Sequence, residues 1–217
     1  MTRAGLREGV FFAPRLFAVA GVPLLPDVRK ASVRDLAIVH GASLPHAEHV
    51  ARLALQLHDS LAEARVIAAS VDARELLFAA AMLHDLGMAI GYDDHEGHSH
   101  YLILGAGLPG FDPRGLALIA QIVRYHRKGT PDLDDLRPFA RRADRELVQR
   151  CALLLRLAEL LEIGEEQLVR EARLVRDGGS VELRLEGDGH LALWNVRRQL
   201  GDEAFRRVFG HRLLLPH

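Results

Sequence analysis

The amino-acid sequence predicts a mainly α protein: a helical bundle followed by a small α+β appendage at the C-terminus. Apolar residues recur at the spacing of helix faces in several segments before residue 165. One central segment is apolar nearly all round, which is typical of a buried helix. After residue 165, apolar and polar residues alternate as in half-buried strands. We therefore expect an irregular extension over 1–30, a helical domain over 31–165 and an α+β tail over 166–217 packed on it.

Composition and charge restrict the class of protein. The chain has 217 residues, 49% of them hydrophobic and 26% charged, so it is long enough to bury its own core. Its 28 basic and 29 acidic residues lack the basic surplus of nucleic-acid-binding proteins. The single cysteine, Cys151, excludes internal disulfides and cysteine-rich zinc sites. Without a membrane-length apolar run or a secretory start, we expect a cytoplasmic protein with no membrane partner and no sequence-specific nucleic-acid partner.

The first two predicted helices follow the proline-punctuated start. Ser32 with Asp35 resembles a capping box, so the first helix should begin there and end near Gly41. Pro45 suits the first turn of the second helix. The apolar stripe of this second helix consists of Val50, Leu53, Leu57 and Leu61.

The central helix and the segment after it come next. Asp72 with Glu75 is a second capping signal and predicts the almost wholly apolar helix over residues 74 to about 88. A polar loop is expected over 91–97, followed by a short helix over 99–104.

Two longer helices complete the predicted bundle. Asp112-Pro113 should cap a helix that runs to about Lys128 and stops at Gly129. A loop over 130–138, rich in Asp and Pro, then precedes a long helix over 144–162.

The tail is predicted to contain three strands and a broken helix. Residues 171–176 and 180–186 alternate, and Asp177-Gly-Gly between them is typical of a hairpin turn. A helix from about His190 should be interrupted at Gly201 and end at Gly210, before a last strand over 212–215.

Histidines are concentrated in the helical domain. Eight of the twelve lie between His46 and His126, where an even spread would place about 4.5. The pair His84-Asp85 lies in the apolar central helix, where an imidazole and a carboxylate are costly to bury unless they are partnered. A divalent cation held between them would offset that cost. The other such pair, His58-Asp59, has no comparable support.

Three more residues of metal-binding type lie on inward faces of other predicted helices. His46, His126 and Glu159 each continue an apolar stripe where an apolar residue would be routine. Together with His84-Asp85 they would form a pocket in the bundle core, which His95 and His98 could close. Two simpler interpretations stay open: a core histidine hydrogen-bonded to a neighbour, and a Glu159 paired with an arginine.

Arg124, Arg127 and Lys128 form a basic group beside His126. At a helix C-terminus these side chains can neutralise the macrodipole. Beside a metal pocket they would instead bind phosphate oxygens, with the arginines acting as bidentate forks. A metal site with arginines suits a phosphoester or phosphoanhydride substrate better than a peptide.

His46, His84-Asp85 and the late carboxylate resemble the HD superfamily of metal-dependent phosphohydrolases. Five segments sharpen this: Gly5-Leu-Arg-Glu-Gly9, Leu83-His-Asp-Leu-Gly-Met-Ala-Ile90, His98-Ser-His-Tyr-Leu-Ile103, Val123-Arg-Tyr-His-Arg-Lys-Gly129 and Leu153-Leu-Leu-Arg-Leu-Ala158. Together they resemble the C-terminal HD-like domain of the exopolyphosphatase/guanosine pentaphosphate phosphohydrolase (Ppx/GppA) family, from about Gly5 to the C-terminus.

The resemblance implies an HD-domain bundle that hydrolyses a phosphoester or phosphoanhydride with one or two divalent ions (Mn, Fe, Zn, Ni or Mg). The expected substrate is a nucleotide, including guanosine polyphosphates, with polyphosphate second. Asp85 would be catalytic, and Arg124, Arg127 and Lys128 would bind phosphate. The implied ligands of the first ion are His46, His84, Asp85 and Glu159. Those of the second are Asp85, His98 and His126, with His95 in reserve.

The chain departs from the family in two respects. The family's exopolyphosphatase and pentaphosphate chemistry belongs to an N-terminal actin-like region, for which a chain of this length has no room. HD enzymes usually end their ligand set with Asp, whereas the matching residue here is Glu159. The alternatives are therefore a non-catalytic module, which binds polyphosphate or nucleotide or docks onto a separate phosphatase domain, and a purely structural helical protein. The resemblance also makes a homodimer plausible.

Overall fold

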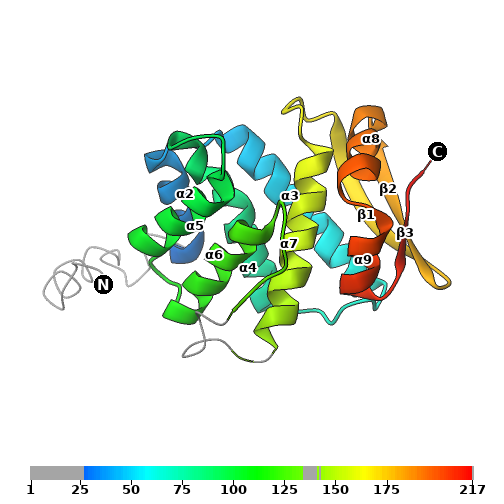
Figure 1. Ribbon diagram of the computed structural model, residues 1–217, viewed down its shortest axis with the longest axis horizontal. Helices are drawn as coiled ribbons and strands as arrows, with labels where there is room; N and C mark the ends of the chain where they lie inside the picture. Colours follow the sequence, from blue (N-terminus) through cyan, green and yellow to red (C-terminus); the bar gives the residue numbers. More distant parts are fainter. Residues whose placement is uncertain (1–26, 134–140, 142, 217) are drawn as a thin grey trace, which may run out of the picture.

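The computed structural model describes residues 27–133, 141 and 143–216, and it is mainly helical, as predicted (Figure 1). The helical bundle precedes a small sheet and two further helices. The elements of the bundle are α2 (Val28–Val39), α3 (Leu44–Glu63), α4 (Val71–Leu83), the 3-10 helix η1 (Leu86–Ala89), α5 (His95–Ala106), α6 (Pro113–Tyr125) and α7 (Asp144–Leu161).

Helix α7 is shared by the bundle and the C-terminal part. It packs against α3, α4 and α6, and also against α8 (His190–Gln199) and α9 (Asp202–Phe209). Figure 1 shows α7 in the middle of the molecule, with α2, α4, α5 and α6 to one side, α8 and α9 to the other, and α3 crossing behind it. Its two faces therefore belong to two different packing layers.

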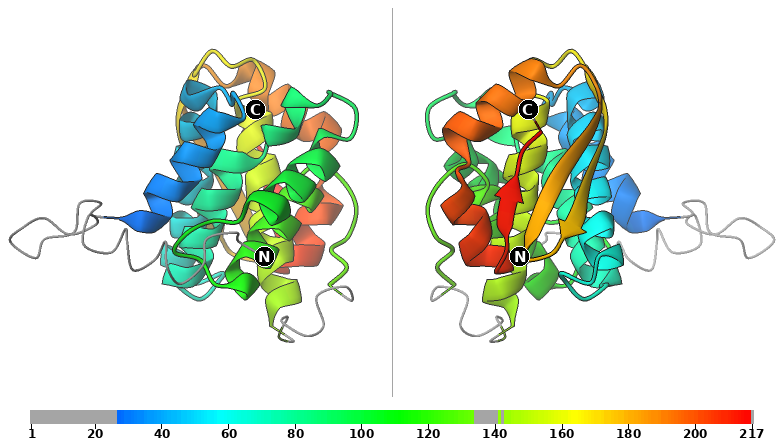
Figure 2. Two further views of the ribbon diagram at one scale, coloured as in Figure 1. Left: turned by 90° about the vertical axis from the view of Figure 1, so that its left-hand side faces the viewer. Right: turned by 90° about the vertical axis from the view of Figure 1, so that its right-hand side faces the viewer.

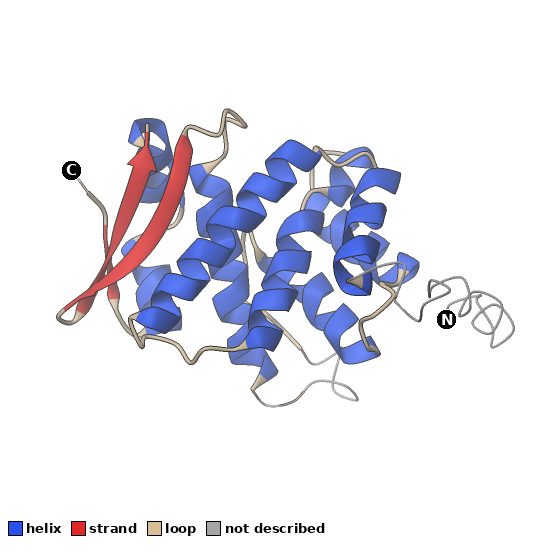
Figure 3. Ribbon diagram, turned by 180° about the vertical axis from the view of Figure 1, so that it is seen from behind, coloured by secondary structure: helices blue, strands red, loops and turns tan. Residues whose placement is uncertain are grey.

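The sheet contains β1 (Val169–Asp177), β2 (Ser180–Gly187) and β3 (Arg212–Leu214), in the order β1-β2-β3. Asp177 pairs with Ser180, so the β1-β2 hairpin has the expected two-glycine loop. β3 runs parallel to β2 after the excursion through α8 and α9. β1 packs on α3, which places the sheet at one end of the molecule (Figures 2 and 3).

Two predicted helix starts were wrong. Helix α2 begins at Val28 because the side chain of Asp27, not Ser32, accepts a hydrogen bond from the Lys30 N–H. Residues 28–30 are therefore helical rather than irregular, while the rest of the expected extension, 1–26, lies outside the described residues. Helix α4 is capped by Ser70, whose hydroxyl accepts from Ala73 N–H, and not by the predicted pair Asp72 and Glu75.

Three other boundaries differ from the prediction by several residues. Helix α4 ends at Leu83 rather than near 88, α5 begins at His95 rather than 99, and α6 ends at Tyr125 rather than 128. The predicted loop over 130–138 is non-helical up to residue 133, and the remainder of it is outside the described part of the chain. These shifts place the metal-type side chains of α4, α5 and α6 at helix ends.

The core is continuous through the bundle. The predicted stripe of α3 is fully buried and packs on α4 and α7. Cys151 is buried in α7, as expected of a core residue, and burial raises the pKa of its thiol to about 12. Among the described helices, none has the length and hydropathy required to span a bilayer.

Candidate metal centre

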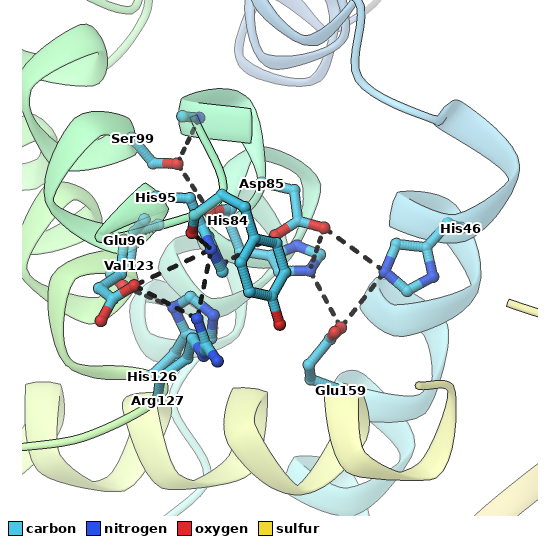
Figure 4. Close-up of polar contacts among 12 residues, drawn as sticks. His46, His84, Asp85, His95, Glu96, Ser99, Val123, His126, Arg127 and Glu159 are labelled. Carbon is cyan, nitrogen blue, oxygen red and sulfur yellow. Dashed lines mark hydrogen bonds and ion pairs between the residues drawn. The ribbon is translucent and has the colours of Figure 1, made fainter. Parts of the chain in front are cut away.

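Two groups of metal-type side chains meet in the bundle (Figure 4). Within each group, one ligand atom per residue lies within 4.8 Å of every other. The first group comes from α3, the end of α4 and α7; the second comes from the end of α4, α5 and the end of α6. The first consists of His46, His84, Asp85 and Glu159, and the second of Asp85, His95 and His126.

Asp85 belongs to both groups and presents one carboxylate oxygen to each. Its Oδ2 lies 3.4 Å from His84 Nε2 and 3.8 Å from His46 Nε2. Its Oδ1 lies 3.3 Å from His95 Nε2. The side chain is 28% exposed, so the carboxylate that joins the groups is reached by solvent. This is the arrangement in which one carboxylate can bridge two cations.

The break after α4 brings His84 and Asp85 to the same point. Neighbouring residues in a continuous helix diverge by about 100°. Here the hydroxyl of Ser99, a fully buried residue of α5, donates to the His84 carbonyl at 2.7 Å and accepts the Gly87 N–H at 2.7 Å. The chain consequently leaves the α-helix and continues as η1. Sequence reasoning missed Ser99, because its partners are distant along the chain.

Gly87 allows η1 to lie directly on α5. A Cβ atom at this position would collide with the carbonyl oxygen of His95, and would lie 2.6 Å from the His98 Cβ and 2.7 Å from the Ser99 nitrogen. The absence of a side chain at Gly87 thus fixes the distance between Asp85 and the first turn of α5.

Three histidines of the centre are oriented by backbone carbonyls. His84 Nδ1 donates to Ala81 at 2.8 Å, His126 Nδ1 donates to Val123 at 2.6 Å, and His95 Nδ1 lies 3.1 Å from the Tyr92 carbonyl. In each case the carbonyl precedes the histidine by three residues. In His126 the proton on Nδ1 leaves Nε2 as the lone-pair nitrogen that can ligate a metal. In His84 and His95 the same contact turns Nε2 toward Asp85.

The surroundings of His126 indicate whether this centre suits a cation. Its Nε2 is buried and, among the residues that the structure describes, has no hydrogen-bond partner. Burial, together with the neighbouring His84, lowers the pKa of His126 to about 4. A neutral, buried and unpartnered ring nitrogen beside the Asp85 carboxylate fits a divalent metal ion, which would supply the missing partner.

The first group shows the opposite electrostatics. Burial opposes a charge on His84, but Asp85 and Glu159 outweigh it and raise the pKa of His84 to about 9. Burial likewise opposes the Glu159 carboxylate, but His84 and His46 hold the pKa of Glu159 well below its ordinary value. The carboxylates of Asp85 and Glu159 therefore stabilise a positive charge at this point, and a metal ion can supply that charge in place of a proton.

Glu159 reaches the centre despite its extra methylene. Its Oε2 lies 3.0 Å from His84 Nε2 and 3.3 Å from His46 Nε2. Within the described part of the chain, the Glu159 carboxylate therefore faces two imidazoles rather than an arginine partner.

His98 is not part of either group among the described residues, contrary to its expected role at the second ion. Its Cβ packs close to the Gly87 backbone, and its Nδ1 is buried without a hydrogen bond in the part of the chain described. His95, expected only as a reserve ligand, lies in the second group instead. The early start of α5 at His95 is the reason: the first residue of the helix, not the fourth, faces Asp85.

The basic residues at the end of α6 have partners that the sequence did not indicate. Lys128 Nζ lies 3.1 Å from Glu96 Oε1, and Arg127 Nη1 lies 3.7 Å from Glu96 Oε2. Glu96 is buried, and no sequence signal marks it. Arg127 also approaches His95 Nδ1 at 3.4 Å. Arg124 is exposed on α6 and acts electrostatically on His100, where it and burial lower the histidine pKa.

A second His–Glu pair lies one turn from the first. His49 and Glu162 are buried, and His49 Nε2 lies 3.3 Å from Glu162 Oε2. The same nitrogen lies 3.0 Å from the Val169 carbonyl in β1, and Glu162 accepts the Gln167 N–H at 3.0 Å. Sequence reasoning did not single out Glu162. The pair joins the centre to the sheet.

A comparison with protein families finds a match over most of the chain. A family model described as "Ppx/GppA phosphatase, domain III" matches residues 28–200. The match includes every residue of both ligand groups and ends at the start of the segment that leads to α9.

Proposed function

The chain belongs to the family of Ppx/GppA phosphatase domain III, and on that premise we propose that it is a metal-dependent hydrolase of phosphoesters or phosphoanhydrides. The observation that carries the proposal is the shared carboxylate of Asp85, which directs one oxygen to each of two groups of imidazoles. A two-ion arrangement of this kind is used for displacement at phosphorus.

The proposed ligands are the two groups described above. His46, His84 and Glu159 would hold one divalent ion, His95 and His126 the other, and Asp85 both. The carbonyl-bonded imidazoles direct Nε2 at the centre, and α4 and α6 direct the negative ends of their dipoles there. When bound, the ions would acidify a water and offset charge on phosphate oxygens. The imidazole donors favour Fe, Ni or Zn over Mg, and the two carboxylates also suit Mn.

Arg127 is the proposed phosphate-binding residue. It is exposed, and its guanidinium lies between Glu96 and His95 of the second ligand group. A phosphate oxygen at the rim could accept from the same guanidinium without dissociating it from Glu96, because the group has several donors. Lys128 would add positive charge more weakly, and Arg124 we place outside the site. The substrate is a phosphorylated small molecule or polyphosphate.

A non-catalytic module is the second candidate. The matching family model describes one domain of a phosphatase, which favours a role in binding phosphorylated ligands or in docking to a separate phosphatase domain. Such a module would bind phosphate compounds without turning them over.

Asp85→Ala separates the two candidates. Metal content would be measured by mass spectrometry on protein purified without chelators, together with phosphate release from a panel of nucleotides, guanosine polyphosphates and polyphosphate. For the enzyme, wild type carries one or two equivalents of transition metal and releases phosphate, and Asp85→Ala loses both. Metal-free wild type without turnover would contradict the proposal.

The matched control is Asp59→Ala, which removes the carboxylate of the chain's other His-Asp pair. Asp59 lies 3.0 Å from His58 Nδ1 and is also paired with Arg74. This pair is therefore satisfied within the fold, and Asp59→Ala should keep wild-type metal content and turnover.

A further inference from the structure

Tyr92 presents an exposed aromatic ring beside the second ligand group. It lies in the loop between η1 and α5, and it is 64% exposed. Its carbonyl is the one that faces His95 Nδ1 at 3.1 Å. The two ring centroids are 5.9 Å apart, with an angle of 47° between the planes. A flat, solvent-facing surface therefore adjoins a side chain of the metal centre.

The ring is held in place by a cation. The Arg127 guanidinium carbon lies 5.6 Å from the centre of the Tyr92 ring, within the range of a cation–π interaction. Arg127 is in turn held by the buried carboxylate of Glu96, at 3.7 Å. The contacts from Glu96 to Arg127 and from Arg127 to Tyr92 thus hold the exposed aromatic ring beside the metal centre.

The neighbours of Tyr92 suit a neutral planar group rather than a phosphate chain. Met88 and Ile90, just before it, are exposed apolar residues. Asp93 and Asp94, just after it, are exposed carboxylates. These two charges repel an extended polyanion on this side of the centre, whereas a neutral aromatic ring gains from the apolar surface.

We propose that Tyr92 is the stacking surface for an aromatic base of the substrate, which makes nucleotides, rather than linear polyphosphate, the substrate class. The inference rests on the proposed function, because that function places the phosphates at the ligand groups. Stacking uses the π-face that all bases share. Tyr92 therefore selects nucleotides over polyphosphate without selecting one base over another.

The test compares substrates with the same number of phosphates. Phosphate release from GTP, ATP and inorganic tripolyphosphate would be measured for Mn²⁺-loaded wild type, Tyr92→Ala and Tyr92→Trp. The matched control is Tyr101→Ala: Tyr101 is 73% exposed on α5 and makes no ring contact or hydrogen bond within the described residues. Circular dichroism would verify that each variant is folded.

Tyr92→Ala should raise KM for GTP and ATP about tenfold, with kcat unchanged, while KM for tripolyphosphate stays within about twofold. Tyr92→Trp should keep the wild-type KM values, and Tyr101→Ala should change none. An equal rise in KM for tripolyphosphate, or an unchanged KM for GTP, would overturn the inference.

Failure of the proposed function is detected separately. If wild type releases phosphate from none of the three, it is not the proposed hydrolase, and the binding of GTP and tripolyphosphate is measured by equilibrium dialysis. A tenfold weaker binding of GTP alone in Tyr92→Ala then supports the stacking role. Equal GTP binding by Tyr92→Ala and wild type, or no GTP binding by wild type, overturns it.

Discussion

Single side chains at the metal centre are held by the backbone of the helices that they terminate. The Nδ1 atoms of His84 and His126 donate to carbonyls in the last turns of α4 and α6. At a helix C-terminus the last carbonyls lack the N–H partner four residues on, and the Val123 carbonyl has only a long bond of 3.4 Å from the His126 N–H. Each of these hydrogen bonds thus caps its helix and fixes the orientation of the imidazole, so the Nε2 atoms face the centre before any ion is bound.

Glu159→Gln should remove one ion and leave the other. In the described ranges of the chain, Glu159 pairs with His46 and His84 of the first group, whereas Asp85 serves both groups. Loss of its charge should weaken metal binding at the first group by about 10- to 100-fold. In a protein that binds two equivalents, titration with Mn²⁺ should show one equivalent retained. Loss of both, or of neither, would contradict the division into two groups.

Asp144 provides a pH-dependent contribution to stability far from the centre. Burial opposes its charge, but the Arg114 hydrogen bonds and the Arg141 N–H hold the pKa of Asp144 below its ordinary 3.8. Asp144→Asn should lower the free energy of unfolding at pH 7 by roughly 2–3 kcal/mol. Because the folded-state pKa is lowered, this difference is fully present above about pH 5 and disappears as pH falls through that pKa.

Urea unfolding at a series of pH values would measure this contribution. Glu146→Gln is the control, because Glu146 forms an exposed pair with Arg150 on the same helix and should change stability by less than about 0.5 kcal/mol. A destabilisation by Asp144→Asn that grows on acidification would show that the stated charge interaction is not its cause.

At the scale of elements, the centre depends on where helices end. The sequence predicted α3, α7, both long strands and the hairpin well, because regular periodicity and turn residues specify them locally. It predicted too long an α4 and too late an α5. Those boundaries depend on Ser99 and Gly87 meeting across 12 residues of chain, and local propensity contains no information about such a contact.

In the candidate site too, residues marked by a local pattern were predicted and residues placed by packing between elements were not. His46, His84, Asp85, His126 and Glu159 were predicted to converge because each interrupts an apolar stripe. Glu96 and the choice of His95 over His98 escaped prediction, because both depend on the orientation of α5 against η1.

Gly87→Ala should disrupt the contact between η1 and α5. The added methyl group would meet backbone atoms of His95 and Ser99, so the two elements must separate. We expect a loss of roughly 2–3 kcal/mol in the free energy of unfolding and a lower affinity for the ion held by His95 and His126. Thermal unfolding and metal titration would measure the two effects.

Gly105→Ala is the matched control in α5. A Cβ at Gly105 has open space around it, and alanine favours the helix, so this variant should be about 0.5–1 kcal/mol more stable than wild type with unchanged metal binding. Similar effects of the two substitutions would indicate that close packing at Gly87 does not position the centre.

On the scale of the whole molecule, α7 and the His49–Glu162 pair unite the bundle with the C-terminal part. α7 packs on helices of both parts, and His49 in α3 reaches the first residue of β1. The sequence indicated separate segments before and after residue 165, but it did not indicate this shared layer. The spacing of apolar residues along one element does not show which other elements that element packs against.

The shared layer predicts that metal-free protein unfolds in one transition. Trp194 is the chain's only tryptophan and lies in α8, so its fluorescence reports on the C-terminal part, while far-ultraviolet circular dichroism reports mainly on the bundle. The two urea curves should coincide. Separate midpoints would mean that the tail unfolds independently of α7.

Anomalous X-ray scattering from crystals of Mn²⁺-loaded protein tests the central claim most directly. The account predicts peaks beside both carboxylate oxygens of Asp85, one among His46, His84 and Glu159 and the other between His95 and His126. Bound Mn²⁺ located only away from Asp85, or a centre without Mn²⁺ at saturating concentration, would contradict it.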